Sequence, residues 1–215
     1  AKKEIVRRYY NALVAARKGE LSTDIIYKHE LQMKQAGVTV ADRPVIAAAI
    51  AKRDETGEPA TAIELRDGTI VTGKTSILLG ATSAMLLNAL KTLAGIDDDV
   101  HLISPSVIEP VQHLKVEHLG NQNPRLHTDE LLIALSVCAV SSPEAEMAME
   151  QLANLRGCDA HSTVILSPTD ENLLKKLGRE AEINTAVIEF NNYVAKEWQP
   201  LLEVTRTELR NDVET

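Results

Sequence analysis

The spacing of apolar residues changes after the first quarter of the chain, and this change constrains the fold more than any other feature. Through residues 1–57 the apolar residues recur at helical spacing, which predicts a helical subregion. The stretch TAIELRDGTIVTGK over residues 61–74 is instead β-branched and roughly alternating, with Asp67-Gly68 at its centre. An Asp-Gly pair between two such runs is a strong signal for a β-hairpin. The chain therefore combines helices with an antiparallel pair of strands.

The hairpin prediction also specifies a register. A two-residue turn at the Asp-Gly pair places Leu65 opposite Ile70 and Ile63 opposite Thr72. Ile63, Leu65 and Ile70 then share one face of the hairpin. We therefore expect that face to be buried and the other to be more polar.

Two further strands are predicted, and each leads into a helix through a Ser-Pro pair. They contain the motifs HLISP at residues 101–105 and VILSP at residues 164–168. In the second motif, Ser167 is the expected N-cap and Pro168 the first helical residue. Between the hairpin and the first of these strands, the apolar pattern predicts a long helix over residues 75–95.

These elements together predict an α/β fold. A mixed sheet that includes the β-hairpin is covered by several helices, with a helical N-terminal segment and a C-terminal helix. We expect an α/β domain over residues 1–178 and a helical tail over residues 179–215. The tail carries an apolar stripe at helical spacing, formed by Ile183, Val187, Phe190, Val194 and Trp198. Because this stripe concentrates the scarce aromatic residues, the tail either docks on its own domain or forms an interface.

Composition narrows the classes of function. The formal net charge is −8, so a basic surface that binds nucleic acid is not expected. Aromatic residues make up only 3% of the chain, so the core must be built from aliphatic side chains. No apolar run is long enough to span a membrane, and no signal peptide precedes the first helix. A cytoplasmic protein without a membrane or nucleic-acid partner is expected.

The pattern of cysteine and acidic residues does not predict a metal site. Cys138 and Cys158 are far apart and neither belongs to a C-x-x-C pair, which is consistent with a reduced protein that has two free thiols. The acidic run Asp97-Asp98-Asp99 is either an exposed turn or a cation ligand set, and an exposed turn fits its surroundings better. The sequence therefore predicts no metal, and it leaves any cofactor unknown.

The stretch GTIVTGKT, from Gly68 to Thr75, satisfies the Walker A pattern letter for letter. In a phosphate-binding loop the four middle residues wrap a phosphate, but here all four are β-branched strand formers. The turn already accounts for Gly68. Neither predicted strand ends in the Asp of a Walker B motif. A nucleoside triphosphatase is therefore the third of our alternatives, behind two others given below.

The second half of this stretch gives a smaller hypothesis. Lys74, Thr75 and Ser76, here called the junction cluster, lie where a strand is expected to end and a helix to begin. Free backbone N–H groups, two hydroxyls and an ammonium group would meet there and bind an anion. The alternative is that Thr75 or Ser76 only caps the helix and Lys74 is solvated.

Two other groups of residues are candidates for a site. His161 opens a predicted strand close to Asp159, and this strand pair could act as a general acid and base or simply be polar ends of a strand. Asn123, Arg125 and His127, here called the rim loop, lie in the polar segment NQNPRLHTDE before a helix. Such loops are commonly solvated, but this one gathers several groups able to bind a ligand.

Several long stretches together resemble a known family. They are AIELRDGTIVTGKTSILLGATSAMLLNALKTLAGI, HLISPSVIEPVQHLK, NPRLHTDELLIALSVCAV, GCDAHSTVILSPTDENLLKKLG and the opening RRYYNALVAARKGE. On these motifs the chain resembles the C-terminal half of uncharacterised protein family 0371, also called domain of unknown function 1846, from about Lys3 to Gly178. Family members are about twice this length, so the chain is similar to a fragment or a separate C-terminal part. The resemblance implies no established activity.

The leading hypothesis is an enzyme, or part of one, that acts on a small anionic metabolite. The junction cluster would hold the anion, the strand pair would supply an acid and a base, and the rim loop would line the opening. This hypothesis requires the three groups to converge in space. The runner-up is a non-catalytic interaction or oligomerisation domain, partnered by another copy or by the missing N-terminal half. The sequence leaves open whether the protein is an enzyme.

Overall fold

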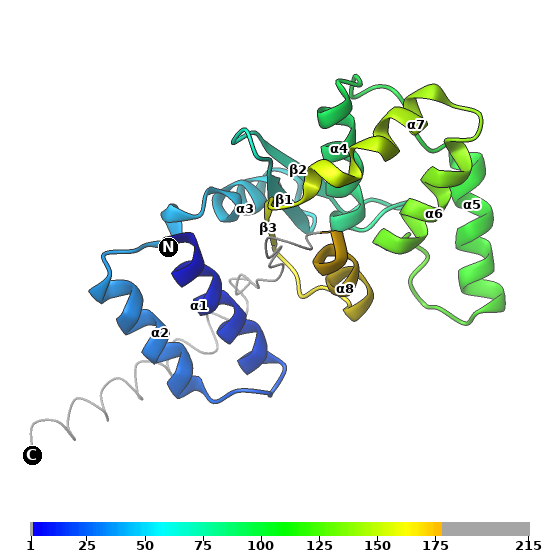
Figure 1. Cartoon of the computed structure of the whole chain (residues 1–215). Helices are drawn as coiled ribbons and strands as arrows, with labels where there is room; N and C mark the ends of the chain where they lie inside the picture. The colour runs from blue at the N-terminus through cyan, green and yellow to red at the C-terminus, as the bar shows by residue number, and fades with distance from the viewer. Residues whose placement is uncertain (1, 178–215) are drawn as a thin grey trace, which may run out of the picture.

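The computed structural model describes residues 2–177 (Figure 1). The helices are α1 (Lys2–Arg17), α2 (Thr23–Gln35), α3 (Pro44–Thr56), α4 (Ala81–Ala94), α5 (Pro105–His113), α6 (Thr128–Cys138), α7 (Pro143–Glu150) and α8 (Pro168–Leu177). The strands are β1 (Ala60–Glu64), β2 (Ile70–Lys74) and β3 (Asp159–Ser162). Shorter helical segments are η1 (Val40–Asp42), the π-helical η2 (Leu114–His118) and η3 (Gln151–Leu155).

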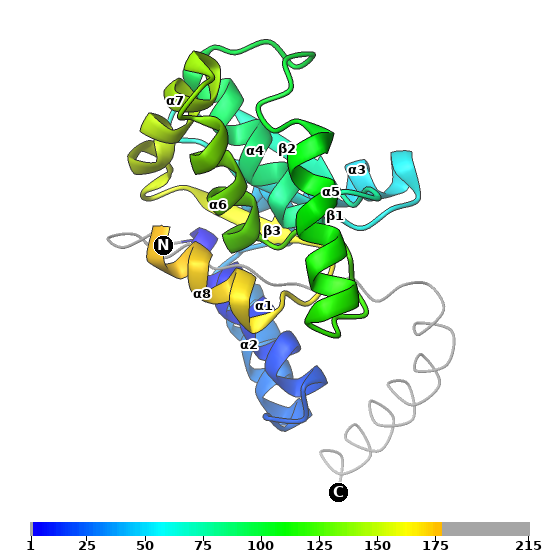
Figure 2. The same ribbon diagram turned by 90° about the vertical axis from the view of Figure 1, so that its right-hand side faces the viewer.

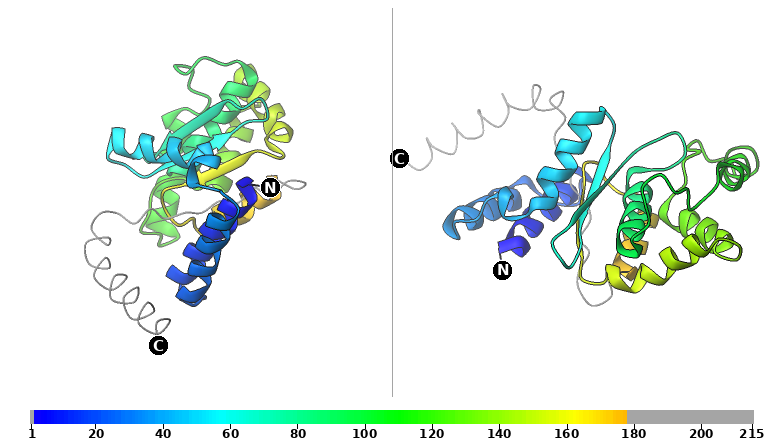
Figure 3. Two further views of the ribbon diagram at one scale, coloured as in Figure 1. Left: turned by 90° about the vertical axis from the view of Figure 1, so that its left-hand side faces the viewer. Right: turned by 90° about the horizontal axis from the view of Figure 1, so that it is seen from above.

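The predicted α/β fold, with a hairpin covered by helices, is confirmed. In the described residues the strands form one sheet in the order β2-β1-β3, and both pairings are antiparallel. Helix α3 packs on one face of this sheet and α4 on the other, and α4 to α8 gather on the second side (Figure 3). The central strand alternates accordingly, because Ala62 packs against Val45 and Ala49 of α3 while Ile63 joins the main core around α4.

The hairpin forms where it was predicted, but its register is different. Ile63 pairs with Val71 rather than Thr72, and Glu64 pairs with Ile70. The loop has three residues, closed by a hydrogen bond from the Leu65 N–H to the Thr69 carbonyl, and Gly68 adopts a φ of 88°. A type I turn followed by a left-handed glycine is the usual three-residue hairpin loop. The predicted two-residue register is therefore wrong by one position.

The helix predicted over residues 75–95 begins later than expected. Strand β2 ends at Lys74, but α4 starts at Ala81 with Gly80 as its N-cap. An irregular segment over residues 75–80 separates the two elements. The prediction that the junction cluster lies at a helix start is therefore wrong. Local sequence could not reveal this, because Ile77, Leu78 and Leu79 continue the apolar pattern of the helix.

Tertiary packing accounts for the second glycine of the Walker-like stretch. A Cβ atom at Gly73 would overlap the backbone of Met85 in α4, so the strand and the helix touch through main-chain atoms at this point. Glycine allows such a close approach because it has no side chain. Gly68 serves a turn and Gly73 serves strand-to-helix packing, and the residues between them lie mainly in β2. This geometry gives no support to the P-loop alternative.

The strand predicted at HLISP is absent. Leu102 and Ile103 are buried in the main core, but they lie in a bend that leads directly into α5. Two apolar residues followed by Ser104 and Pro105 suit a short buried connection as well as a strand. The strand predicted before the second Ser-Pro pair is confirmed only in part, because β3 ends at Ser162 and residues 164–166 of the VILSP motif lie outside it.

The serine residues predicted to cap helices α7 and α8 do so in the structure. Ser142 caps α7 through a bond from the Ala145 N–H, and Ser167 accepts a bond from the Asp170 N–H at the start of α8. Across the described residues, no helix has the length and apolar character needed to cross a membrane. The predicted tail helix over residues 179–215 lies outside the described residues, so the proposed domain division at residue 178 stays a prediction.

The first two helices form a pair that extends away from the rest of the molecule (Figures 1 and 2). Val6 and Tyr10 of α1 pack with Met33, Val38 and Ile46 in a small core of their own. Helix α1 also reaches the sheet, where the Tyr10 ring lies edge-on to the His161 ring with centroids 5.3 Å apart. The side of the sheet that carries α3 is therefore partly covered by α1 as well.

Candidate functional site

Two of the three candidate groups lie together. The Arg125 Nε donates to the Ser76 carbonyl at 2.6 Å, which joins the rim loop to the junction cluster. The adjoining segments run side by side, because Leu126 donates its N–H to the Leu78 carbonyl and forms a parallel bridge with Leu79. Ser76 of the junction cluster and Arg125 of the rim loop thus meet between β2 and the start of α6.

The backbone of the junction cluster is already occupied. The Thr75 N–H donates to the Pro59 carbonyl and the Ser76 N–H to the Leu79 carbonyl, both at 2.8 to 2.9 Å. The Ser76 hydroxyl accepts from the N–H groups of Leu78 and Leu79. The free N–H groups that the helix-start prediction invoked are therefore absent, and only side chains remain as candidate anion ligands.

Lys74 differs from its neighbours. Its side chain is exposed and has no hydrogen bond or ion pair within the described residues. It lies opposite Ala60 in the register, on the α3 side of the sheet, whereas Gly73 faces α4. Lys74 is the last residue of the edge strand β2, so its side chain lies at one end of the sheet.

Arg125 is held from several directions. Its N–H donates to the Asn123 side-chain oxygen at 3.2 Å, and its carbonyl accepts from the Lys115 ammonium at 2.6 Å. Lys115 is buried and also donates to Glu130 at 2.6 Å. These contacts fix the main chain of the rim loop, so the guanidinium projects from a well-anchored segment. The two terminal nitrogens of Arg125 have no partner in the described part of the chain.

His127 belongs to a different network, centred on Asp170. The His127 Nδ1 lies 3.1 Å from Asp170 Oδ2. Thr128 donates both its N–H and its hydroxyl to Asp170 Oδ1, at 2.9 and 2.8 Å, and the Ser167 hydroxyl donates at 2.8 Å. Burial by itself would raise the pKa of Asp170, but these donors outweigh it and lower the pKa.

The Asp170 network joins two helix N-termini. Asp170 lies in the first turn of α8 and also caps the first turn of α6, where the backbone N–H groups favour a negative charge. We did not predict this role for Asp170. Its position after a Ser-Pro pair indicated only a helix start, because the chain distance to Thr128 is 42 residues.

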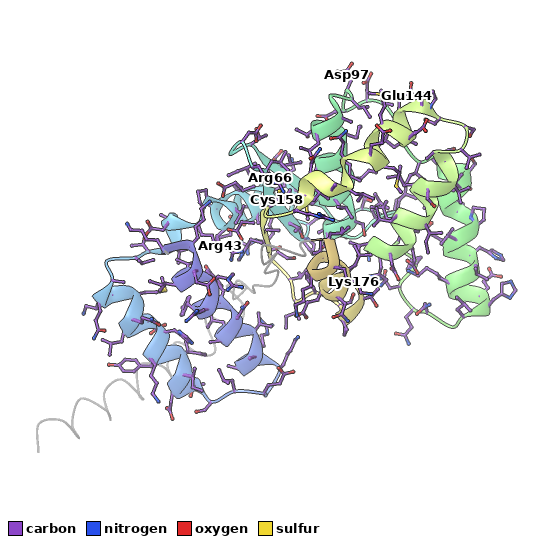
Figure 4. The ribbon with its side chains drawn as sticks, in the orientation of Figure 1. Arg43, Arg66, Asp97, Glu144, Cys158 and Lys176 are labelled. Atoms are coloured by element: carbon purple, nitrogen blue, oxygen red, sulfur yellow. The ribbon has the colours of Figure 1, made fainter. Side chains whose placement is uncertain are left out.

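Asp159 of the strand pair is engaged by Arg43. Arg43 is 2% exposed, and its guanidinium donates two bonds to Asp159 at 2.7 and 2.9 Å and one to the Ala160 carbonyl at 2.6 Å. Figure 4 labels Arg43 where the α1–α2 pair meets the sheet. A bidentate pair of this kind fixes the start of α3 to β3. No local pattern predicts this pair, since 116 residues separate the two partners.

His161 is buried without a polar partner. Its ring is fully buried, and neither ring nitrogen forms a hydrogen bond. Burial, with a smaller contribution from the positive charge of Arg43, lowers the pKa of His161 from 6.5 to about 3. The ring is therefore neutral at physiological pH. No hydrogen bond joins His161 to Asp159, so these two residues do not form a dyad.

The three candidate groups do not converge on one point. His161 and Asp159 lie opposite Ala62 and Glu64, on the face of the sheet that α3 and α1 cover. Ser76 and Arg125 belong to the loops on the α4 side. The structure therefore brings Ser76 to Arg125, while the strand pair lies on the other face of the sheet, which is also the face of Lys74.

The remaining candidates offer no reactive group. Burial raises the pKa of the Cys158 thiol, which disfavours the nucleophilic thiolate. Asp97, Asp98 and Asp99 are exposed in a turn, and the Lys91 ammonium donates to the Asp98 carbonyl. In the described ranges, no three or more His, Cys, Asp or Glu side chains are grouped so as to hold a metal ion.

Known proteins similar to this chain agree on the family. Residues 41–187 match a family described as domain of unknown function DUF1846, C-terminal. The chain is 57% identical over 178 residues to a UPF0371 protein of Corynebacterium urealyticum, and 52% identical over 178 residues to one of Streptococcus pyogenes. Each alignment covers 83% of this chain and 36% of the relative. The matched residues thus span little more than a third of the relatives' length.

Proposed function

Because the chain belongs to the DUF1846 (UPF0371) family, whose name assigns no activity, we propose a function from its geometry. The domain binds a small anionic molecule at the surface formed by the junction cluster and the rim loop. One observation carries this proposal, namely the 2.6 Å bond from the Arg125 Nε to the Ser76 carbonyl. That bond orients a guanidinium beside the junction cluster.

The available donors suit a phosphate or carboxylate. The terminal nitrogens of Arg125 can offer two parallel N–H bonds to an oxyanion, which is the geometry that favours arginine over lysine at such sites. The Thr75 hydroxyl and the Lys74 ammonium are the next donors along β2 and the loop that follows. Neither of these two cationic side chains has a carboxylate partner in the described residues, so both charges are available to an anion.

In this proposal the chain is the part of an enzyme that binds the anion. His161 is on the other face of the sheet, so we assign it no acid or base role toward the anion. The groups that react with the bound molecule would come from the portion of the family's polypeptide that the matched residues do not cover. A small anionic metabolite held by Arg125 would be presented to that portion.

A titration with inorganic phosphate tests the proposal. We expect phosphate to shift the NMR signals of the Arg125 Nε–H and the Thr75 amide in the wild-type chain. Arg125→Ala should weaken phosphate binding at least tenfold. Lys74→Ala should weaken it less, because a flexible ammonium cannot form the two parallel hydrogen bonds that a guanidinium forms with an oxyanion. Binding unchanged in Arg125→Ala, or no binding in the wild type, would refute the proposal.

Arg66 provides a matched control for this titration. Arg66 is exposed and Arg125 is half-buried, but the Nε of each donates to a backbone carbonyl, which for Arg66 is that of Arg156 at 2.7 Å. Figure 4 labels it on the hairpin, away from α6. Arg66→Ala removes the same charge from the chain, so it should leave phosphate affinity unchanged if the effect is local. An equal loss in both variants would indicate a general charge effect instead.

One observation favours the alternative of an oligomerisation domain. Ile133, Val137 and Val140 are exposed at helical spacing along α6 and its C-terminal turn. An uncharged apolar stripe can pair with the same stripe of a second copy without bringing like charges together. Sedimentation of the wild type against Ile133→Ser with Val137→Ser tests this, and a wild-type monomer at high concentration would refute it.

A further inference from the structure

Helix α2 leaves most of its apolar residues outside the core. Of its large apolar side chains Ile25, Ile26, Tyr27, Leu31 and Met33, only Met33 is buried. Tyr27 is 62% exposed and Leu31 is 43% exposed. These two residues are one helical turn apart and therefore lie on the same face. An amphipathic helix normally buries such a face, so this one lacks a covering partner in the described residues.

The position of α2 explains why the face is uncovered. Among the described helices and strands, α2 packs against α1. Helix α1 contacts β3 through Tyr10 and leads to Lys18, which pairs with Glu171 of α8 at 3.8 Å, whereas α2 lies on the far side of α1 (Figure 1). The outward side of α2 is therefore turned away from every described layer of the α/β fold.

The family comparison indicates what covers this face. Helices α1 and α2 precede residue 41, at which the match to the C-terminal family domain begins. The matched residues amount to 36% of the relatives' length, so most of each relative's polypeptide is not represented here. A helix pair placed before the C-terminal domain is well situated to contact that remaining portion.

We propose that the face of α2 formed by Tyr27 and Leu31, here called the α2 face, docks on the N-terminal portion of UPF0371 proteins. The partner surface is a folded protein surface with an apolar centre. Asp24, Lys28 and Lys34 are exposed around the α2 face and form a polar rim of mixed charge. An apolar centre with a polar rim is the usual anatomy of a protein interface. This proposal is independent of anion binding at Arg125.

Hydrogen exchange on two intact proteins tests the proposal. The hydrogen-exchange protection factor of each peptide is measured in the full-length UPF0371 protein of Corynebacterium urealyticum and in this chain, and the two values are compared. We expect the segment that aligns with α2 to be protected at least tenfold more in the full-length protein than α2 is in this chain. The segment that aligns with α4, which is buried in both, should differ little. Equal protection of the α2 segments would overturn the proposal.

Variants of this chain separate the other possible occupants. The double variant Tyr27→Ser, Leu31→Ser is compared with a matched control, the double variant Lys28→Ser, Gln32→Ser. We expect the two double variants to unfold at the same urea midpoint. The control substitutes two exposed residues of the same helix at the same spacing, so it carries a similar cost in helix propensity. A midpoint lowered only in the first variant would show that another segment of this chain covers the α2 face, against the proposal.

A second copy of the chain is the last competitor. Wild-type protein that sediments as a dimer, and becomes a monomer with Tyr27→Ser and Leu31→Ser, would assign the α2 face to self-association. That result would also overturn the proposal. A wild-type chain whose sedimentation is unaffected by these substitutions, together with the tenfold protection in the full-length protein, would support it.

Discussion

His161 should make the stability of this protein sensitive to mild acid. The ring is fully buried, neither nitrogen has a hydrogen-bond partner, and burial together with Arg43 lowers its pKa to about 3. In the unfolded chain the same ring is in water, with a pKa near 6.5. Between these two values the unfolded state binds a proton that the folded state does not. Stability is therefore fully present above about pH 6.5 and falls as the pH drops toward 3.

The size of the effect follows from linkage. Each pH unit between the two pKa values changes the free energy of unfolding by about 1.4 kcal/mol. From pH 7 to pH 5 the contribution of His161 amounts to a loss of about 2 kcal/mol. The size of this loss is set by the pKa of His161 in the unfolded chain, because at pH 5 the buried ring of the folded protein is still almost entirely neutral. It is a large fraction of the stability of a typical domain.

The variant His161→Phe isolates this contribution. Phenylalanine keeps an aromatic ring against Tyr10 and removes both unpaired nitrogens, so we expect stability at pH 7 to be equal or higher. Urea unfolding followed by circular dichroism at pH 7, 6 and 5 gives the free energy for each protein. The wild type should lose about 2 kcal/mol more than the variant across this range.

A control and a refuting outcome complete the experiment. His101 is exposed, so His101→Phe should leave the pH dependence of unfolding the same as in the wild type. If the curves of wild type and His161→Phe run parallel from pH 7 to pH 5, His161 is not buried and neutral as described. Parallel curves would therefore refute the placement of α1 over β3.

Substitutions at three further residues test the packing that positions the candidate site. Gly73→Ala should destabilise the fold by about 3 kcal/mol in urea unfolding, because the new Cβ overlaps the backbone of α4; an unchanged midpoint would contradict this contact. Asp170→Ala should cost about 3 kcal/mol, since it leaves buried donors at the start of α6 unpaired, and Asp170→Asn should cost less because an acceptor remains. Arg43→Lys should lower the free energy of unfolding by about 2 kcal/mol, measured by thermal or urea unfolding, because an ammonium cannot form the bidentate pair with Asp159. Equal stability of the variant and the wild type would show that the pair is not formed in solution.

Sequence by itself determined the features that depend on neighbours in the chain. The hairpin at Asp67-Gly68, the serine caps of α7 and α8, and the helical segment before residue 57 were all predicted, because turn and cap residues act within a few positions. The register of the hairpin was not, since a three-residue loop and a two-residue loop use the same Asp-Gly signal.

Only the tertiary structure decided which distant residues meet. It brings Arg125 to Ser76 and Arg43 to Asp159, and it delays the start of α4 to Ala81. These outcomes depend on how helices share the two faces of the sheet, and no local pattern specifies that sharing. For the same reason, sequence could name candidate site residues but could not divide them between the faces. Burial of a side chain is decided by the whole fold, whereas a cap is decided by a single turn.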